Sequence, residues 1–295
     1  MKHPLRFLII EEKTEKNHLD LVKAIQDLGH EPYHFRLSDL VLRSTEKGLA
    51  AYFGGIPFTD FDIVLPRTVS SNLRLGRLLL RLGSEHQFIL DHTISKRDTF
   101  GKVSQAWTLL EAGILHPKIF YTKKIEDFKQ GIEKALQFPC IAKPVVGSQG
   151  RGVRLIKNFQ EALEFFQSVD EDYLFQEYLP IESDYRVFVI DQEILGTMRR
   201  FVAPNDIRSN VSIGAKTEAS LATPEIRKVA LQAAAAFDYD ISGVDIAIVG
   251  DKHYVLEVNR TPQWQGLKQA LSIDPAKAIV EFCLHKHSLL NGRPQ

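Results

Sequence analysis

Cysteine is nearly absent from the chain. Cys140 and Cys283 are the only two cysteines among 295 residues. Two cysteines are too few for a disulfide framework, and they lack the spacing of a zinc site. Cys140 lies inside an apolar run, where a thiol usually behaves as a small buried hydrophobe. The sequence therefore predicts neither a disulfide-stabilised fold nor a thiolate metal site, and the reducing cytoplasm is the expected setting.

An excess of one charge is also missing, because 37 Lys and Arg residues balance 37 Asp and Glu residues. This balance supports neither nucleic acid nor a membrane surface as a partner. The apolar run LRFLII near the N-terminus is too short for a signal-peptide core or a membrane span. With 25% charged and 44% hydrophobic residues, the composition is typical of a soluble globular protein of this length with two or three lobes.

The glycine motif of dinucleotide-binding proteins is missing as well. The first strand, expected over residues 5–10, runs into IIEEKTEKNH and not into G-x-G-x-x-G. Strand and helix signals nevertheless alternate through residues 1–95. Strands are expected over 5–10, 32–37, 61–65 and 88–90, and helices over 19–28 and 72–82. This alternation predicts a small α/β lobe with a parallel sheet.

Glycine is concentrated in one stretch, Phe138 to Ile156, which reads FPCIAKPVVGSQGRGVRLI. Two strand signals flank the glycines, a pattern that predicts a β-hairpin. Such a loop can bring backbone N–H groups against an anion, and Lys143 adds a point charge suited to phosphate. The stretch is not a Walker A loop, because that motif opens a helix. On this stretch alone, a plain tight turn and a phosphate lid are equally open.

Further elements follow from apolar periodicity. Helices are expected over 98–111, 126–136, 159–166, 225–237 and 274–289. Strands are expected over 118–121, 173–178, 186–190, 194–201, 244–249 and 254–258. The strands over 186–190 and 194–201 are joined at Asp191-Gln192, which favours antiparallel pairing.

Three oxygen-bearing side chains gather on the last predicted hairpin. Glu257 and Asn259 are two residues apart in a strand, so they share a face. With a turn at residues 250–252, Asp245 would lie directly across from Glu257, with Cβ atoms ~5 Å apart. Two carboxylates so placed need a neutralising cation, and oxygen ligands suit Mg²⁺ shared with substrate phosphates. An acidic sheet face without metal is the alternative; the metal site is the preferred interpretation.

The motifs KPVVGSQGRGV, QEYLP, D-x-R, RSN, GVDI and EVN occur in this order between residues 143 and 259, and the resemblance that they carry extends over nearly the whole chain. In this set the chain resembles the ATP-grasp ligases, and within them the RimK-type branch of glutamate ligases that modify a ribosomal protein. The resemblance implies an α/β (α+β) ATP-grasp fold. It implies a Rossmann-like pre-ATP-grasp lobe over 1–95, a central lobe with a glycine-rich lid over 96–180, and a C-terminal lobe with the magnesium site over 181–295.

The resemblance also implies a role for each matching position. The residues implied to bind nucleotide are Lys102, Lys143, Gly147, Ser148, Gly150, Gly152, Gln176, Glu177, Tyr178, Leu179, Asp184, Arg186, Ser209 and Asn210. Among these, the lysines would contact the phosphates, the glycine loop would cover them, and residues 176–179 would form the hinge at the adenosine. Arg208, with Lys143, would act in catalysis, and Asp245, Glu257 and Asn259 would be the magnesium ligands.

By the same resemblance the protein would be an ATP-dependent carboxylate–amine ligase that forms an amide through an acyl-phosphate. The expected reaction adds an amino acid such as glutamate to a peptide or small acid, with ATP and Mg²⁺, or Mn²⁺ in its place. The expected partners are ATP, a carboxylate and an amine substrate, with a protein or peptide tail as one form of acceptor, and a homo-oligomer is compatible with the family. The alternatives are an ATP-grasp kinase acting on a small molecule and a nucleotide-binding regulatory protein.

Overall fold

The computed structural model describes residues 3–12, 16–46, 48–67, 73–95, 101–147, 150–202 and 216–292. The chain forms two compact units. Unit 1 contains Met1–Arg97, Asp238–Ile241 and Arg260–Gln295, and unit 2 contains Asp98–Phe237 and Ser242–Asn259. The expected division into lobes over 1–95, 96–180 and 181–295 stays a prediction.

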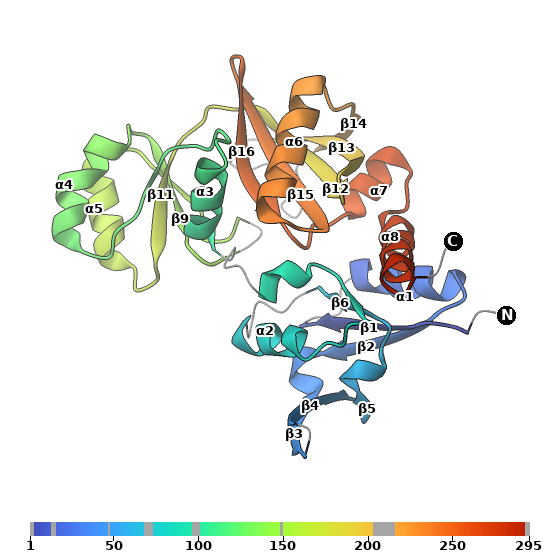
Figure 1. Ribbon diagram of the computed structural model, residues 1–295. Helices are drawn as coiled ribbons and strands as arrows, with labels where there is room; N and C mark the ends of the chain where they lie inside the picture. Colours follow the sequence, from blue (N-terminus) through green and yellow to red (C-terminus); the bar gives the residue numbers. More distant parts are fainter. Residues whose placement is uncertain are drawn as a thin grey trace. The chain divides into compact units, whose positions relative to one another are not determined.

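A four-stranded parallel sheet forms the centre of unit 1 (Figure 1). Its strands, in the order β2–β1–β6–β7, are β2 (Glu31–Arg36), β1 (Arg6–Glu11), β6 (Ile63–Pro66) and β7 (Phe88–Ile89). All neighbouring pairs are parallel. The side chains from Phe7 to Ile10 are inaccessible to solvent, as expected for an inner strand covered on both faces. The prediction of a small α/β lobe with a parallel sheet is confirmed.

Helices from both ends of the sequence belong to unit 1. From the N-terminal part come α1 (Lys16–Asp27) and α2 (Leu73–Arg81). From the C-terminal part come α7 (Gln265–Leu271) and α8 (Pro275–Leu290), and α8 packs against α1. Within the described residues, none of the helices is both long and apolar enough to cross a bilayer.

A small antiparallel sheet, β3–β4–β5, was not predicted from the sequence. Its strands are β3 (Leu40–Thr45), β4 (Gly48–Phe53) and β5 (Ile56–Pro57). Four of the six residues of β3 are exposed, so no buried face imposes an apolar pattern on the strand. Burial is what makes a strand readable in sequence, and here it is mostly lacking.

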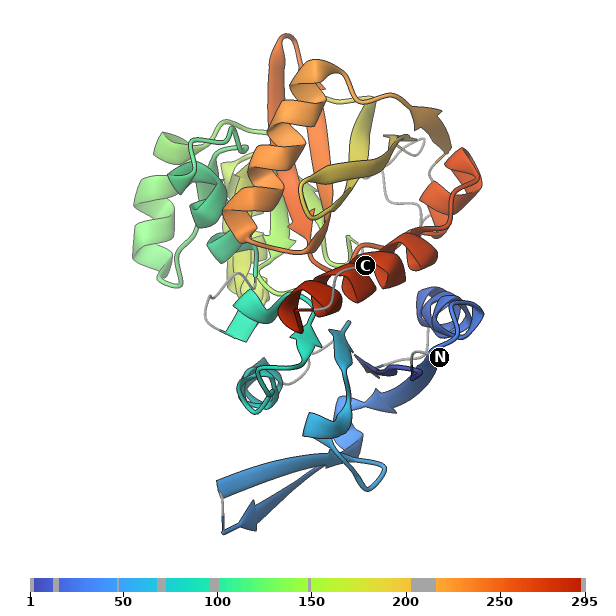
Figure 2. The ribbon, with the colours of Figure 1, turned by 45° about the vertical axis from the view of Figure 1, so that its right-hand side comes forward.

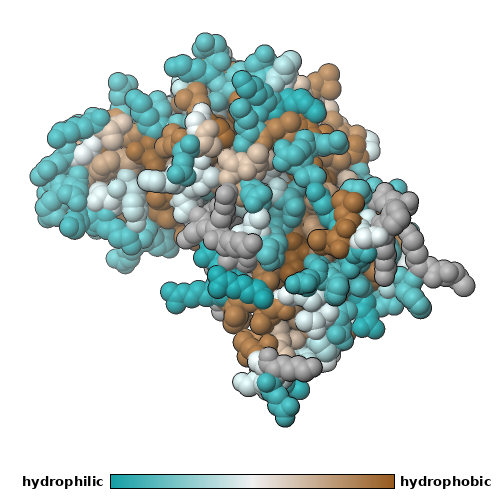
Figure 3. Space-filling view, viewed as in Figure 1, coloured by the Kyte–Doolittle hydropathy of each residue, from teal (hydrophilic) through white to brown (hydrophobic). Residues whose placement is uncertain are grey.

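The first sheet of unit 2 has the order β10–β9–β11–β8. Its elements are β8 (Ile119–Phe120), β9 (Cys140–Pro144), β10 (Arg154–Ile156) and β11 (Tyr173–Glu177), with helices α4 (Ile125–Ala135) and α5 (Phe159–Ser168). Phe128 of α4 stacks on Phe166 of α5 with ring centroids 4.3 Å apart, and both rings pack beside Phe175 of β11. The outer surface of these helices, on the left of Figure 3, is largely hydrophilic. Their apolar faces therefore cover the sheet.

The second sheet of unit 2 has the order β14–β13–β12–β15–β16. Its strands are β12 (Ser183–Ile190), β13 (Glu193–Phe201), β14 (Thr217–Ser220), β15 (Ile241–Val249) and β16 (Lys252–Asn259). Helix α6 (Pro224–Phe237) contacts β12, β13 and β16, and Figure 2 shows it lying along the sheet. Helix α3 (Lys102–Glu111) packs against α6 and β16. The predicted antiparallel pairings of β12 with β13 and of β15 with β16 are confirmed.

Candidate active site

The glycine-rich stretch is the connection of a β-hairpin, since β9 and β10 pair antiparallel with Ala142 opposite Arg154. At Gly152 the backbone has φ +73°, a conformation that L side chains rarely adopt. A Cβ atom there would lie 2.7 Å from Cγ of Pro144 and 3.1 Å from the hydroxyl of Tyr173. Glycine is therefore required at 152 by backbone conformation and by close packing against the base of the loop.

Two lysines lie at the base of this loop. The backbone N–H of Lys102, at the start of α3, donates to Val145 O at 2.9 Å, and its Nζ donates to Gly147 O at 3.1 Å. Lys143 lies on β9. Burial lowers the pKa of Lys143 to about 8; the Glu257 carboxylate opposes this shift, and the charge of Lys102 adds to it. The protein thus holds two cations close together, which favours an anionic ligand.

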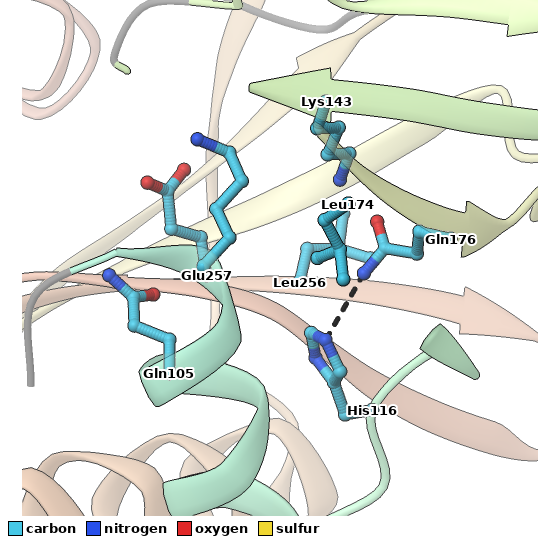
Figure 4. A pocket seen from close by; sticks show the side chains of 8 residues that line it. Gln105, His116, Lys143, Leu174, Gln176, Leu256 and Glu257 are labelled. Atoms are coloured by element: carbon cyan, nitrogen blue, oxygen red, sulfur yellow. Dashed lines mark hydrogen bonds between the residues drawn. The ribbon is translucent and has the colours of Figure 1, made fainter. Parts of the chain in front are cut away.

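These lysines share a pocket with side chains from α3, β11 and β16, and with a residue that precedes β8 (Figure 4). The residues that line it are Lys102, Gln105, His116, Lys143, Leu174, Gln176, Leu256 and Glu257. The pocket lies wholly within unit 2. Four of the predicted site residues, Lys102, Lys143, Gln176 and Glu257, are therefore together.

The predicted hinge begins at the end of β11. Nε2 of Gln176 lies 3.1 Å from Nε2 of His116, whose Nδ1 lies 2.7 Å from Val255 O. Glu177 forms two hydrogen bonds with Lys118, the residue before β8. Its Oε2 accepts from the backbone N–H of Lys118 at 3.0 Å, and its own N–H donates to Lys118 O. Tyr178 and Leu179 follow as half-buried residues without regular structure. Gln176 thus faces the pocket, and Glu177 braces the strand pair.

The three proposed metal ligands lie on β15 and β16. Asp245 pairs directly with Glu257, and Gly243 pairs with Asn259. The amide nitrogen of Asn259 donates to Gly243 O at 3.5 Å, which leaves the amide oxygen to face elsewhere. Two carboxylates and one amide oxygen form a set of hard donors.

Asp245 is also held by two arginines. Arg186 reaches it with a bidentate pair through Nε and NH2, and Arg200 NH2 lies 3.0 Å from Oδ2. Burial alone would raise the pKa of Asp245, but the charges of Arg186 and Arg200 outweigh it and lower the pKa below its usual value. Asp245 is therefore an anion at neutral pH, the state that a metal ligand needs. The oxygen donors are of the type that Mg²⁺ prefers, but both oxygens of Asp245 accept from arginines here, so the magnesium site stays a prediction.

The two residues of the D-x-R motif, Asp184 and Arg186, bind different partners. Arg186 binds Asp245, whereas Asp184 accepts two hydrogen bonds from Arg200, both at 2.7 Å. Asp184 is 2% exposed and Arg200 is 4% exposed. Arg200 thus links the two aspartates in a buried network.

Other predicted residues are placed as follows. Gly147 and Gly150 lie in the loop between β9 and β10, and Gly150 has φ +68°. Ser148, Arg208, Ser209 and Asn210 lie outside the described residues.

Several residues of the site were not predicted from sequence: Gln105, His116, Leu174, Arg200 and Leu256. Two of them carry a usable signal. Leu174 lies two residues before Gln176 on one strand, and Gln105 lies three residues after Lys102 on one helix, so each shares a face with a predicted residue. His116 lies in a connection, where no periodicity places it.

The two sheets of unit 2, with lysines from β9 and α3 and a carboxylate from β16 facing one pocket, have the architecture of the ATP-grasp fold. A family model described as "RimK-like ATP-grasp domain" matches residues 100–283. The chain belongs to the RimK-like ATP-grasp family.

Known proteins resemble the chain over most of its length. It is 28% identical over 273 residues to "Probable alpha-L-glutamate ligase 2" of Shewanella sp. strain W3-18-1, covering 89% of each chain. The ATP-grasp ligase PsnB, solved with a phosphomimetic variant of its minimal precursor, Mg and ADP, matches with a TM-score of 0.74 at 18% identity, over 95% of this chain and 98% of that one. A RimK domain protein from Sphaerobacter thermophilus DSM 20745 matches with a TM-score of 0.71 at 19% identity, over 94% and 98%.

Family membership identifies the protein as an ATP-dependent carboxylate–amine ligase. The kinase and regulatory alternatives are not favoured by these comparisons.

Proposed function

We propose that this ligase joins an amino acid, with glutamate as the first candidate, to the carboxylate of a peptide or small acid. The observation that carries the proposal is the pocket in which Lys102, Lys143 and Glu257 meet beside Gln176. Phosphoryl transfer to a carboxylate depends mainly on positioning and charge neutralisation, which such a set supplies. The glutamate ligase named in Shewanella supports the amino acid, and the PsnB complex with its precursor supports a peptide acceptor.

In this proposal ATP lies with its base at residues 176–179 and its phosphates at Lys102 and Lys143. The loop with Gly147, Ser148, Gly150 and Gly152 covers the phosphates and excludes water, which would otherwise hydrolyse an acyl-phosphate. Asp184 and Arg186 would lie on the nucleotide side of the site and hold Asp245 in position, because both belong to the hydrogen-bonded network around Asp245.

Asp245, Glu257 and Asn259 would hold Mg²⁺. Mg²⁺ held there would supply charge that neutralises the phosphates of ATP. Mn²⁺ also accepts an all-oxygen ligand set and is the second candidate metal.

The chemistry has two steps. First, an oxygen of the substrate carboxylate attacks the γ-phosphorus of ATP, the bond from that phosphorus to the bridging oxygen breaks, and ADP leaves. Second, the amine nitrogen attacks the acyl carbon, phosphate leaves with the C–O bond electrons, and the nitrogen loses a proton. Lys143 and Arg208, with Ser209 and Asn210 beside it, would stabilise the charge that develops on the transferred phosphoryl group.

We test the proposal by ADP release from Mg²⁺-ATP across a panel of amino acids, each alone and paired with acidic peptides. Release that requires both a carboxylate and an amine, with a peptide mass increased by one or more aminoacyl units, is expected. Release with a hydroxyl compound and no amine would replace the ligase by a kinase. Light scattering on the same sample tests whether the ligase is a homo-oligomer, and cell fractionation tests the cytoplasmic location that use of ATP favours.

A further inference from the structure

His116 and Gln176 form a hydrogen-bonded pair in the wall of the pocket, and no role above uses His116. Both side chains are buried, with His116 6% and Gln176 3% exposed. His116 precedes β8, and its ring lies between the backbone of β16 and the side chain of Gln176, as Figure 4 shows for the second contact. The pair therefore connects the backbone of one sheet to a side chain of the other.

The partners of His116 determine which atoms carry protons. The carbonyl oxygen of Val255 can only accept, so Nδ1 of His116 must donate to it. The pKa of His116 is lowered to about 4, mainly by burial and to a lesser degree by the charge of Lys143, while the hydrogen bond to Val255 opposes both effects. The ring is neutral at pH 7, so Nε2 carries no proton and can only accept.

An Nε2 atom that only accepts determines the orientation of Gln176. The amide group of Gln176 must direct its NH₂ group, and not its oxygen, at His116. The oxygen then points away from His116, on the side of Lys143 (Figure 4). The pocket thereby presents a hydrogen-bond acceptor, Gln176 Oε1, near a hydrogen-bond donor, the Lys143 ammonium group.

We propose that His116 is a positioning residue that holds the Gln176 oxygen toward the nucleotide base and so selects adenine over guanine. This inference rests on the proposed function, because it places the base of ATP beside Gln176. Adenine carries a 6-amino donor, which complements the Gln176 oxygen, while Lys143 remains with the phosphates. Guanine offers two acceptors, O6 and N7, and its O6 would face the Gln176 oxygen. If the Gln176 amide were rotated so that its NH₂ group faced the base, the pocket would favour guanine over adenine.

The test is nucleotide binding, which needs neither ligase substrate. Dissociation constants for Mg-ADP and Mg-GDP are measured by calorimetry on the wild type, His116→Leu and His116→Gln. In His116→Leu the Gln176 amide can turn, and the ratio of the GDP to the ADP constant is expected to fall by about tenfold or more. In His116→Gln a carbonyl acceptor is kept for the Gln176 NH₂ group, and the preference for ADP is expected to persist.

Lys102→Met is the matched control, because it removes a cation of the same pocket without touching the Gln176 amide. This variant should raise the dissociation constants of Mg-ADP and Mg-GDP by equal factors. A folded His116→Leu protein with an unchanged ratio overturns the inference alone. Failure of the wild type to bind ADP overturns the proposed function and this inference with it.

A second measurement needs no variant at all. In wild-type protein labelled with ¹⁵N-histidine, His116 should show a protonated Nδ1 and an unprotonated Nε2 at pH 7, with and without ADP. A protonated Nε2, in either a neutral or a charged ring, would let Gln176 turn its oxygen to His116 and would overturn the inference even if His116→Leu fails to fold.

Discussion

Asp245 lies directly opposite Glu257, although the turn between their strands has two residues and not the three that this pairing requires in a regular hairpin. Val249 pairs with Lys252 around Gly250-Asp251, and this register continues to Ile246 opposite Val255. A bulge then leaves Leu256 without a partner and shifts the register by one residue. The bulge brings the two carboxylates face to face and directs Leu256 into the pocket wall.

Glu257→Gln should remove ligase activity while the fold is kept. The change removes one of two opposed carboxylates and keeps the side-chain shape, so we expect kcat to fall by at least about 100-fold with Mg²⁺. ADP release measured over a range of Mg²⁺ concentrations checks this. Asp251→Asn, at the exposed turn of the same hairpin, is the control and should keep full activity. Near-normal kcat in Glu257→Gln would mean that the metal lies elsewhere.

Arg200→Met should unfold more easily than the wild type. Arg200 is the shared partner of Asp184 and Asp245, so its loss leaves two buried carboxylates undercompensated. Removing one member of a buried ion network costs about 3–5 kcal/mol. Equilibrium urea unfolding measures the change. Arg199→Met is the matched control: Arg199 donates to Ser183 and lies 4.8 Å from the centre of the Phe201 ring, and its loss should cost about 1 kcal/mol.

Gly152→Ala should weaken nucleotide binding and stability together. The new methyl group would lie 2.7 Å from Pro144, and the backbone there has φ +73°. Gly113 has φ +69°, and a Cβ atom at that position would meet no other atom within 4 Å, so Gly113→Ala introduces backbone strain without a clash. We expect about 1 kcal/mol of lost stability in Gly113→Ala and more in Gly152→Ala, measured by urea unfolding. Equal losses, with equal ADP affinity, would contradict the close packing of the loop.

ATP binding should take up a proton at Lys143. The pKa of this residue is lowered to about 8 in the free protein, and a phosphate beside it would favour the charged form and raise the pKa. Below pH 8 the lysine is already charged in the free protein, so the affinity for ATP does not change with pH. Above pH 8 the free lysine is mostly neutral and must take up a proton from solvent on binding, so the affinity for ATP falls as the pH rises. Calorimetry in buffers of different ionisation enthalpy measures the uptake. Lys143→Arg, charged throughout, should abolish it.

Strand periodicity predicts much of this site from sequence. The two-residue period places Glu257 and Asn259 on one face, and the glycine-rich turn between two apolar strands predicts the hairpin that carries Lys143. The pairing of Asp245 with Glu257 is also predicted, but from a three-residue turn. The structure has a two-residue turn followed by a bulge, which gives the same register at these two residues. Sequence spacing does not distinguish the two, because a bulge depends on packing around Leu256.

Contacts between segments distant in sequence could not be predicted in the same way. His116 meets Gln176 and Val255 across 60 and 139 residues of chain. Arg200 reaches Asp245 from a strand that is not its neighbour in the sheet, since β12 lies between β13 and β15. Such partners share no period with the residues they bind, and only the folded chain brings them together.

The return of the C-terminal helix to unit 1 has a consequence for biosynthesis. Helix α8 buries Ala276, Ile279, Val280 and Cys283, and it packs against α1, more than 240 residues earlier in the chain. During translation the segment with α1 therefore emerges with an apolar surface whose cover, α8, is synthesised more than 240 residues later. Domains usually fold as they leave the ribosome, starting from the N-terminus. In this protein, unit 1 can complete its core only after unit 2 has been made.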